Sequence, residues 1–136
     1  SPSRARIPDM PTLETIARNA SSDEIVDLID GGSGPGTLRF ETSGDVAVAT
    51  LTFSDPSFGN SSGGTATANA ITSDTNAAGG TIAKASAYDS TGAKIIEFTV
   101  GIAASGEEIE MSSLTIGAGD TVSVSSLTIT TPASDA

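Results

Sequence analysis

The sequence predicts a mainly β fold: an antiparallel β-sandwich or jelly-roll-like domain over residues 37–132, preceded by a short N-terminal helical segment. Three observations support this prediction. Apolar and polar residues alternate with period two from Thr37 onward, which is the pattern of half-buried strands. Turn-forming residues divide that region into segments of about ten residues, as in sandwiches and barrels. A helical period of apolar residues occurs in residues 12–30 alone.

The composition limits both the size of the core and the chemistry that the chain can carry. Ser, Thr, Ala and Gly supply 72 of the 136 residues, whereas Ile, Leu, Val and Phe supply 28. The chain has no His, no Cys and no Trp. This composition excludes His-based triads, thiol nucleophiles, Cys or His zinc sites and disulfides. The sequence therefore predicts a protein that is not an enzyme and that holds no cofactor or metal.

The chain is strongly acidic, with 17 carboxylates against 6 basic residues and a net charge of -11. Such a surface repels phosphate backbones and anionic lipids, so nucleic-acid and membrane partners are disfavoured. No apolar run approaches the length of about 18 residues that spans a membrane. Four of the six basic residues lie in the first 39 residues, so the positive charge is concentrated near the N-terminus.

Residues 1–11 predict an extended arm, because their three prolines withhold backbone donors and disfavour helix. The arm lacks the apolar region of a signal peptide. Arg4 and Arg6 make it basic, and we expect it to contact carboxylates on a partner. Met10 is an alternative start, which would make residues 1–9 an upstream extension or a cloning remnant; the sequence leaves both open.

The helical segment over residues 12–30 follows the arm. The polar run 21–24 interrupts its apolar face, which predicts one kinked helix or two short helices, and a Gly pair ends the segment. We expect the apolar face to dock on the chain's own sheet; the alternative is docking on a partner, with Leu13 and Ile16 as contacts. The face has the i, i+3, i+4, i+7 spacing of a helix and consists of Leu13, Ile16, Ala17 and Ala20.

Seven candidate strands complete the chain. The clearest connection between two of them is a hairpin over residues 88–93, in which Gly92 is free to adopt a positive φ. In the last strand the apolar residues change parity near Ser125 and Ser126, which predicts a bulge or a crossing between sheets. The candidate strands are residues 37–42, 46–54, 64–71, 80–88, 93–102, 107–116 and 121–131.

Two strands predict an interface with another copy of the chain. Strand 46–54 carries apolar residues on both faces, and Ile95 points outward from strand 93–102. A chain of this size cannot bury both faces of a strand, so we expect a homodimer or homotrimer.

Clustered carboxylates are the remaining candidates for chemistry. Glu107, Glu108 and Glu110 have the proximity that an acid/base pair requires. The favoured interpretation is an acidic strand edge that discourages aggregation.

A cation site is a second hypothesis for the carboxylates. Residues 74–76 resemble the start of a calcium loop, but position 85, where such a loop needs Glu, is Ala. The sequence leaves open whether the fold brings four loop carboxylates together around a cation: Asp55, Asp74, Asp89 and Asp120.

Three stretches of the chain resemble small head proteins of tailed bacteriophages. They are residues 12–20 with 25–31, the stretch Ala49–Gly59 and the ending Ala118–Thr130, so the resemblance spans roughly residues 11–132. Their motifs are helix faces, turns and strand ends rather than catalytic residues. On these residues the chain is similar to capsid decoration, or cement, proteins.

This resemblance implies a jelly-roll-like β fold and a structural role on the outer surface of the capsid in the virion. It implies that the chain binds the major capsid protein, bridges neighbouring subunits and stabilises the shell. The alternative is a receptor- or carbohydrate-binding β module of a tail fibre or surface protein. That function needs a strip of aromatic and amide side chains, for which the chain offers Tyr88, Asn60, Asn69 and Asn76.

Overall fold

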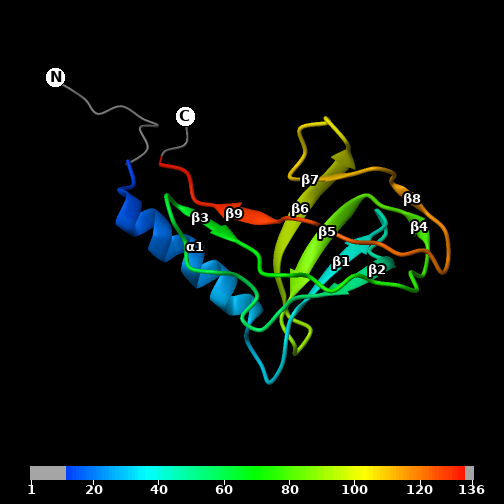
Figure 1. Cartoon of the computed structure of the whole chain (residues 1–136), viewed down its shortest axis with the longest axis horizontal. Helices are drawn as coiled ribbons and strands as arrows, with labels where there is room; N and C mark the ends of the chain where they lie inside the picture. Colours follow the sequence, from blue (N-terminus) through cyan, green and yellow to red (C-terminus); the bar gives the residue numbers. More distant parts are fainter. Residues whose placement is uncertain (1–11, 134–136) are drawn as a thin grey trace.

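The computed structural model describes residues 12–133 and shows a mainly β protein with one helix (Figure 1). The arm expected over residues 1–11, with Arg4 and Arg6, lies outside the described residues. The helix is α1 (Thr15–Ile29), and the strands are β1 (Thr37–Glu41), β2 (Ala47–Thr52), β3 (Thr65–Thr67), β4 (Gly80–Thr81), β5 (Lys84–Tyr88), β6 (Lys94–Ile102), β7 (Ile109–Met111), β8 (Thr115–Ile116) and β9 (Thr128–Thr130).

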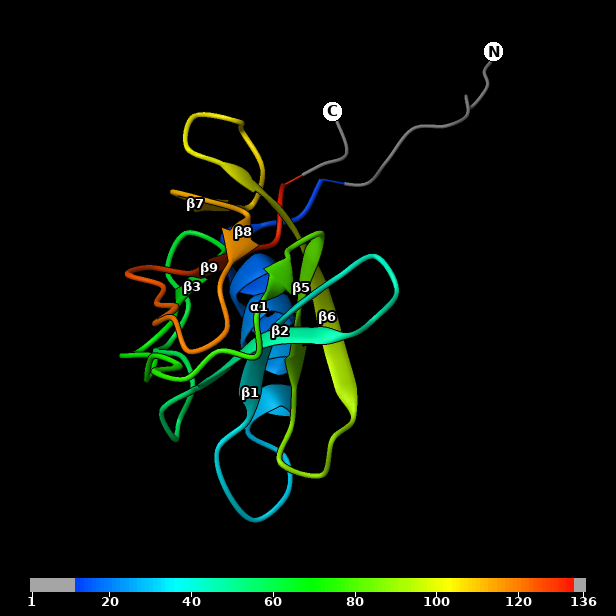
Figure 2. The same ribbon diagram turned by 90° about the vertical axis from the view of Figure 1, so that its right-hand side faces the viewer.

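One curled sheet dominates the fold and has the strand order β2-β1-β5-β6-β7. Its curl gives a half-barrel rather than two stacked sheets (Figures 1 and 2). Two small ribbons, β3–β9 and β4–β8, accompany it. The inner side of the half-barrel holds the core, whose largest fully buried apolar side chains are Phe40, Phe53, Ile29, Leu38 and Leu51. The prediction of a mainly β fold is confirmed.

The prediction of a wholly antiparallel sheet is wrong, because β7 pairs with β6 in parallel. The connection over residues 103–108 doubles back in a tight loop whose N–H groups are held by carboxylates from its far end. Glu108 accepts from the Thr99 N–H at 2.9 Å, and Glu110 accepts from the N–H groups of Ala104 at 3.1 Å and Gly106 at 2.9 Å. The loop therefore re-enters the sheet beside β6 and in the same direction.

Some expected strands are divided because the chain changes pairing partner within them. The expected strand 80–88 becomes β4 and β5, since the Ile82 N–H donates to Leu114 and the next N–H, from Ala83, donates to Glu41. The expected strand 121–131 is likewise reduced to an isolated bridge at Val122 and to β9. The bulge or crossing between sheets expected near Ser125 and Ser126 takes the form of a stretch without strand pairing between that bridge and β9.

Two bulges change the faces from which an oligomer was expected, although Val46, at the start of the expected strand 46–54, stays 63% exposed. Phe40 pairs with Ala49 and Glu41 with Ala47, so Val48 is an extra residue and both Val48 and Ala49 are buried within the chain. The pairing of β5 with β6 shifts in the same way and leaves Ile95 without a cross-strand partner. Ile95 is half-buried against the core, so the expectation of an outward Ile95 is wrong.

The hairpin between β5 and β6 forms as predicted. The Asp89 N–H donates to Ala93 at 2.9 Å, and Gly92 has a φ of +90°. The Asp89 carboxylate accepts from the N–H groups of Thr91 and Ala93. The hydrogen bond from the Thr91 hydroxyl, followed by these backbone hydrogen bonds, holds the pKa of Asp89 below its ordinary value.

Helix α1 is continuous through residues 21–24, where a kink or a break between two helices was expected. The Ser22 hydroxyl donates to the Gly64 carbonyl and Asp23 accepts from the Ser61 N–H, so both side chains bond to a neighbouring loop rather than to the backbone of the helix. It docks within its own fold, against β3 and β9, and lies beside that ribbon in Figure 1. The expected docking face is wrong. Ile16 is 82% exposed and Leu13 is 36% exposed, whereas Ser22, Val26 and Ile29 are buried.

The docking face of α1 is largely polar because it meets bare backbone. Arg18 donates to the carbonyl oxygens of Thr131 and Gly63, each at 2.9 Å. Asn19 accepts from the Gly64 N–H at 2.8 Å, and the buried Ser22 hydroxyl donates to the Gly64 carbonyl at 2.8 Å. Glycine exposes both backbone groups, so polar side chains rather than apolar ones satisfy this contact.

We predict that Val26→Asp lowers the free energy of unfolding by about 3 kcal/mol or more, because it buries an unpaired charge. Ile16→Asp is the matched control on the same helix, and it should change stability by less than about 0.5 kcal/mol because its side chain is exposed. Urea unfolding followed by circular dichroism measures both. Equal destabilisation by the two substitutions would contradict the orientation of α1.

We also predict that Gly36→Ala destabilises the fold by about 2 kcal/mol or more, because a methyl group there overlaps buried backbone. It would lie 2.7 Å from the carbonyl oxygen of Ile29 and closer still to that of Tyr88. Gly34→Ala, in the same linker, has no atom within 4 Å and should leave the melting temperature nearly unchanged. A Gly36→Ala protein as stable as the parent would show that the linker relaxes freely.

Candidate functional site

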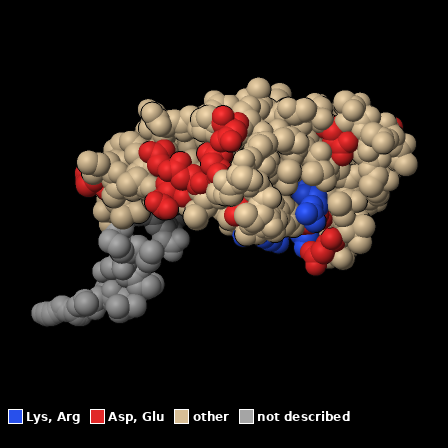
Figure 3. Space-filling model, turned by 90° about the horizontal axis from the view of Figure 1, so that it is seen from below, with Lys and Arg blue, Asp and Glu red and all other residues tan. Residues whose placement is uncertain are grey.

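The outer face of β1, β5 and β6 gathers most of the positive charge of residues 12–133. Strand alternation and cross-strand pairing place Arg39, Lys84 and Lys94 there, and these are three of the four basic residues in that range. Figure 3 shows basic side chains in one area beside carboxylates. We call this surface the charged sheet face; it consists of Arg39, Glu41, Asp45, Lys84, Ser86, Tyr88, Lys94 and Glu97.

A buried carboxylate lies at the centre of the charged sheet face. Glu41 is 1% exposed and accepts hydrogen bonds from the Ser86 hydroxyl at 3.1 Å and the Tyr88 hydroxyl at 2.8 Å. The guanidinium of Arg39 lies 3.5 Å from the same carboxylate. A buried charge is tolerated only when it is paired and hydrogen-bonded, and these three groups meet that need.

Arg39 and Tyr88 form the exposed part of this cluster. The Arg39 guanidinium carbon lies 4.3 Å from the centre of the Tyr88 ring, a cation–π contact. About a third of the Arg39 side chain stays accessible, at 35%. Tyr and Arg are the residue types that most often dominate protein interfaces, and here both are fixed by Glu41 before any partner arrives.

Two exposed ion pairs flank the cluster. Lys84 pairs with Asp45, and Lys94 pairs with Glu97 at 2.6 Å. Hydrogen bonds from the lysines lower the pKa of Asp45 and of Glu97, and raise the pKa of each lysine in return. Exposed pairs add little stability, so their effect is to fix where the charges stand.

The structure distributes the sequence-predicted contact residues over different elements. Leu13 and Ile16 are exposed at the N-terminal end of α1, and Ile95 packs against the core from β6. Arg4 and Arg6 lie outside the described residues. These residues therefore form no single contact surface among residues 12–133.

Sequence reasoning missed the charged sheet face, although part of its signal was visible. Arg39 and Glu41 stand two residues apart, as do Ser86 and Tyr88, and alternation puts each pair on one side of a strand. What the sequence could not show is that β1 and β5 are neighbours, with Arg39 opposite Ser86.

Several of the clustered carboxylates accept hydrogen bonds from the backbone of loops. Glu108 and Glu110 accept backbone N–H groups around residues 99–106. Asp74 accepts from the N–H groups of Thr50 and Asn76, and Asp120 accepts from the Gly117 N–H. Within residues 12–133 no three Asp or Glu side chains come close enough to share a metal ion.

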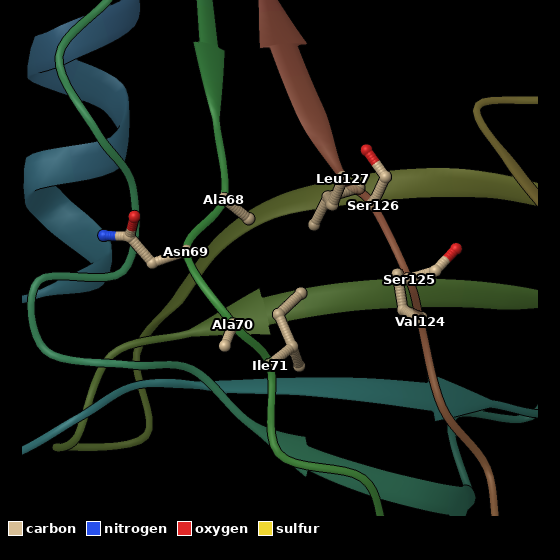
Figure 4. Close-up of a pocket in the computed structure, with 8 residues that line it drawn as sticks. All are labelled: Ala68, Asn69, Ala70, Ile71, Val124, Ser125, Ser126 and Leu127. Carbon is tan, nitrogen blue, oxygen red and sulfur yellow. The ribbon is translucent and has the colours of Figure 1, made fainter.

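Two hollows flank the segment 123–126. The larger, of about 250 Å³, is lined mainly by Ala and Ser with Ile71, Leu127 and a single amide, Asn69 (Figure 4). The smaller, of about 170 Å³, lies between this segment and residues 108–112. Of the residues named for a sugar site, Asn69 lines the larger hollow, whereas the Tyr88 ring lines neither hollow and is covered by Arg39.

The comparisons with known proteins leave the family open. Protein-family models, curated proteins and solved structures give no match to this chain. Across residues 12–133, the single helix is neither long nor apolar enough to cross a membrane.

The phenol of Tyr88 provides a direct measurement of the cluster. Burial, followed by the hydrogen bond and the charge of Glu41, raises the pKa of Tyr88 above its ordinary value of 10.0. Because the folded protein holds this proton more tightly than the unfolded chain, the contribution to stability is complete below pH 10 and is lost as the pH rises through the folded pKa. Near-ultraviolet absorbance reports this titration alone, since the chain has one Tyr and no Trp.

We therefore predict a titration midpoint above 10 in the folded protein and close to 10 in concentrated denaturant. Glu41→Gln should lower the folded midpoint toward 10, because it removes the negative charge that disfavours the phenolate. A folded midpoint at or below 10 would contradict the Tyr88–Glu41 contact, and circular dichroism verifies that the variant is folded.

Proposed function

We propose that this chain is a capsid decoration protein that binds the outer surface of a phage shell and bridges neighbouring major capsid subunits. The proposal starts from the resemblance of residues 11–132 to phage head proteins, and the mainly β class of the fold agrees with that resemblance. The observation that carries it is the partition of charge over the surface.

The charged sheet face is electrically balanced, whereas the rest of the described surface is not. Three cations face three carboxylates on it, and residues 12–133 elsewhere hold one cation and twelve carboxylates. The acidic groups over α1 stand out in Figure 3. A partner surface can therefore approach the charged sheet face without meeting a strong negative potential, and acidic flanks keep decorated particles apart.

In this proposal attachment is distributed over several weak contacts. Arg39 and Tyr88 provide a preformed anchor on the charged sheet face. Leu13, which precedes α1, and Ile16 on α1 offer exposed apolar surface, and the basic arm with Arg4 and Arg6 pairs with carboxylates of the shell. Exposed pairs contribute only about 0–1 kcal/mol each, so firm binding arises from repetition over the shell.

The test uses phage heads from a strain that carries the gene, compared with heads from a strain in which it is deleted. Purified chain added to the deleted heads should restore occupancy, measured by gel densitometry, and should raise the temperature at which the heads release DNA. Lys94→Glu should reduce occupancy at low salt, since it reverses a charge of the charged sheet face. Ser33→Glu adds one negative charge in an exposed linker and should bind like the parent.

The contribution of the arm is tested separately with residues 1–10 deleted. We expect lower occupancy and a weaker dependence on salt, because two arginines are lost. Equal occupancy and equal salt dependence of both forms would remove the arm from the attachment surface. Heads that neither contain nor bind the chain would contradict the decoration function itself.

A further inference from the structure

The β3–β9 ribbon is built from the uncharged part of an acidic protein. Residues 56–73, which contain β3, and residues 121–133, which contain β9, hold no Asp, Glu, Lys or Arg. The chain as a whole carries a net charge of -11. Two copies of the chain repel each other over most of their surface, and this ribbon is a place where they do not.

The two edges of the ribbon differ in how their backbone groups are satisfied. The outer edge of β3 is occupied, because Thr65 exchanges hydrogen bonds with Ser62 at 2.9 and 3.0 Å and the Thr67 carbonyl accepts from Gly59 at 3.0 Å. Between the two strands, the Thr131 N–H donates to the Gly64 carbonyl and the Ala68 N–H donates to the Leu127 carbonyl, in register with the Ala66–Ile129 pair.

That register turns alternate residues of β9 away from β3. Thr128 and Thr130, and Ser126 just before β9, point their N–H and C=O groups away from β3, and within residues 12–133 none of these groups makes a backbone hydrogen bond. The edge is open at Thr128 and Thr130, whereas Ser126 borders the smaller hollow, across which lie residues 108–112. All three residues are exposed. Natural proteins cover or charge such an edge to prevent strand pairing, and β9 itself carries no charge or proline.

We propose that the open edge of β9 pairs antiparallel with β9 of a second copy about a two-fold axis through Thr128. Thr128 then faces its own symmetry mate, and Ser126 faces Thr130 of the other copy. Each such pair exchanges two hydrogen bonds, so the interface forms about six. An antiparallel pairing of a strand with itself is symmetric by construction, as a closed dimer requires.

Side-chain chemistry suits this pairing. Ile129 and Leu127 stay buried in their own core, while threonines remain on the outer side, where Thr65 and Thr130 already share a 2.8 Å hydroxyl contact. Pairing converts two isolated two-stranded ribbons, which are marginal alone, into one four-stranded sheet. The inference is independent of the proposed capsid function.

The test combines light scattering with amide hydrogen exchange on the full chain. The parent should show twice the 13.4 kDa chain mass, and the amides of Thr128 and Thr130 should be protected in proportion to the dimer population. Thr128→Pro should return the mass to 13.4 kDa, because it removes an outward N–H while the bonds from β9 to β3 remain.

A second pair of variants covers the case in which Thr128→Pro does not fold. Thr128→Lys places two like charges opposite each other across the axis and should also give a monomer. Thr67→Lys, at the paired position on the occupied strand, should stay dimeric. A parent that is monomeric at every concentration, or a dimer that survives Thr128→Lys, would overturn the proposal. If the amides of Thr128 and Thr130 are protected from exchange only when another protein is added, the partner of this edge is that protein and not a second copy of the chain.

Discussion

The contact between α1 and bare backbone is the interaction on which the rest of the structure depends. The chain has few large apolar residues, so the helix cannot be held by a wide apolar stripe. Instead Arg18, Asn19 and Ser22 hydrogen-bond to Gly63, Gly64 and Thr131. These bonds tie both strands of the β3–β9 ribbon to the helix, and the buried C-terminal half of α1 then joins the core through Val26 and Ile29.

Carboxylates also satisfy backbone groups elsewhere in the fold, so part of the acidic composition has a structural role. Glu108 and Glu110 shape the loop that makes β7 parallel to β6, and Asp89 closes the hairpin between β5 and β6. An ionised carboxylate accepts strong hydrogen bonds from backbone N–H groups and can satisfy a tight turn without apolar burial. Some of the acidic residues therefore stabilise turns, although the net negative charge of the chain still repels anionic partners.

The charged sheet face and the open edge of β9 belong to different elements of the fold. The first lies on the outer side of β1, β5 and β6, and the second borders the uncharged ribbon. In the proposed function, a copy attached to a shell through the sheet face keeps its β9 edge available for a neighbour. Pairing of two copies would then double the number of shell contacts that must break at once, which strengthens attachment without new chemistry.

The sequence alone determined the class of the fold, because period-two alternation and turn chemistry are local properties of the chain. The hairpin at residues 88–93 and the interruption near Ser125 and Ser126 follow from the same local signals. Strand pairing is not local, so the sequence could not show that β1 lies beside β5 and that Arg39, Glu41 and Tyr88 meet.

Tertiary structure also decided which face of α1 is buried. Apolar spacing selected Leu13 and Ile16, which is sound when a helix packs on apolar side chains. Here the neighbouring layer presents glycine backbone, and a backbone N–H or C=O is satisfied by polar side chains such as Arg18 and Ser22. Register had the same effect in β2, where one extra residue buried both Val48 and Ala49. The sequence shows which residues are apolar. It does not show which face of a helix is buried, because that depends on whether the segment packed against the helix presents apolar side chains or backbone N–H and C=O groups that need hydrogen bonds.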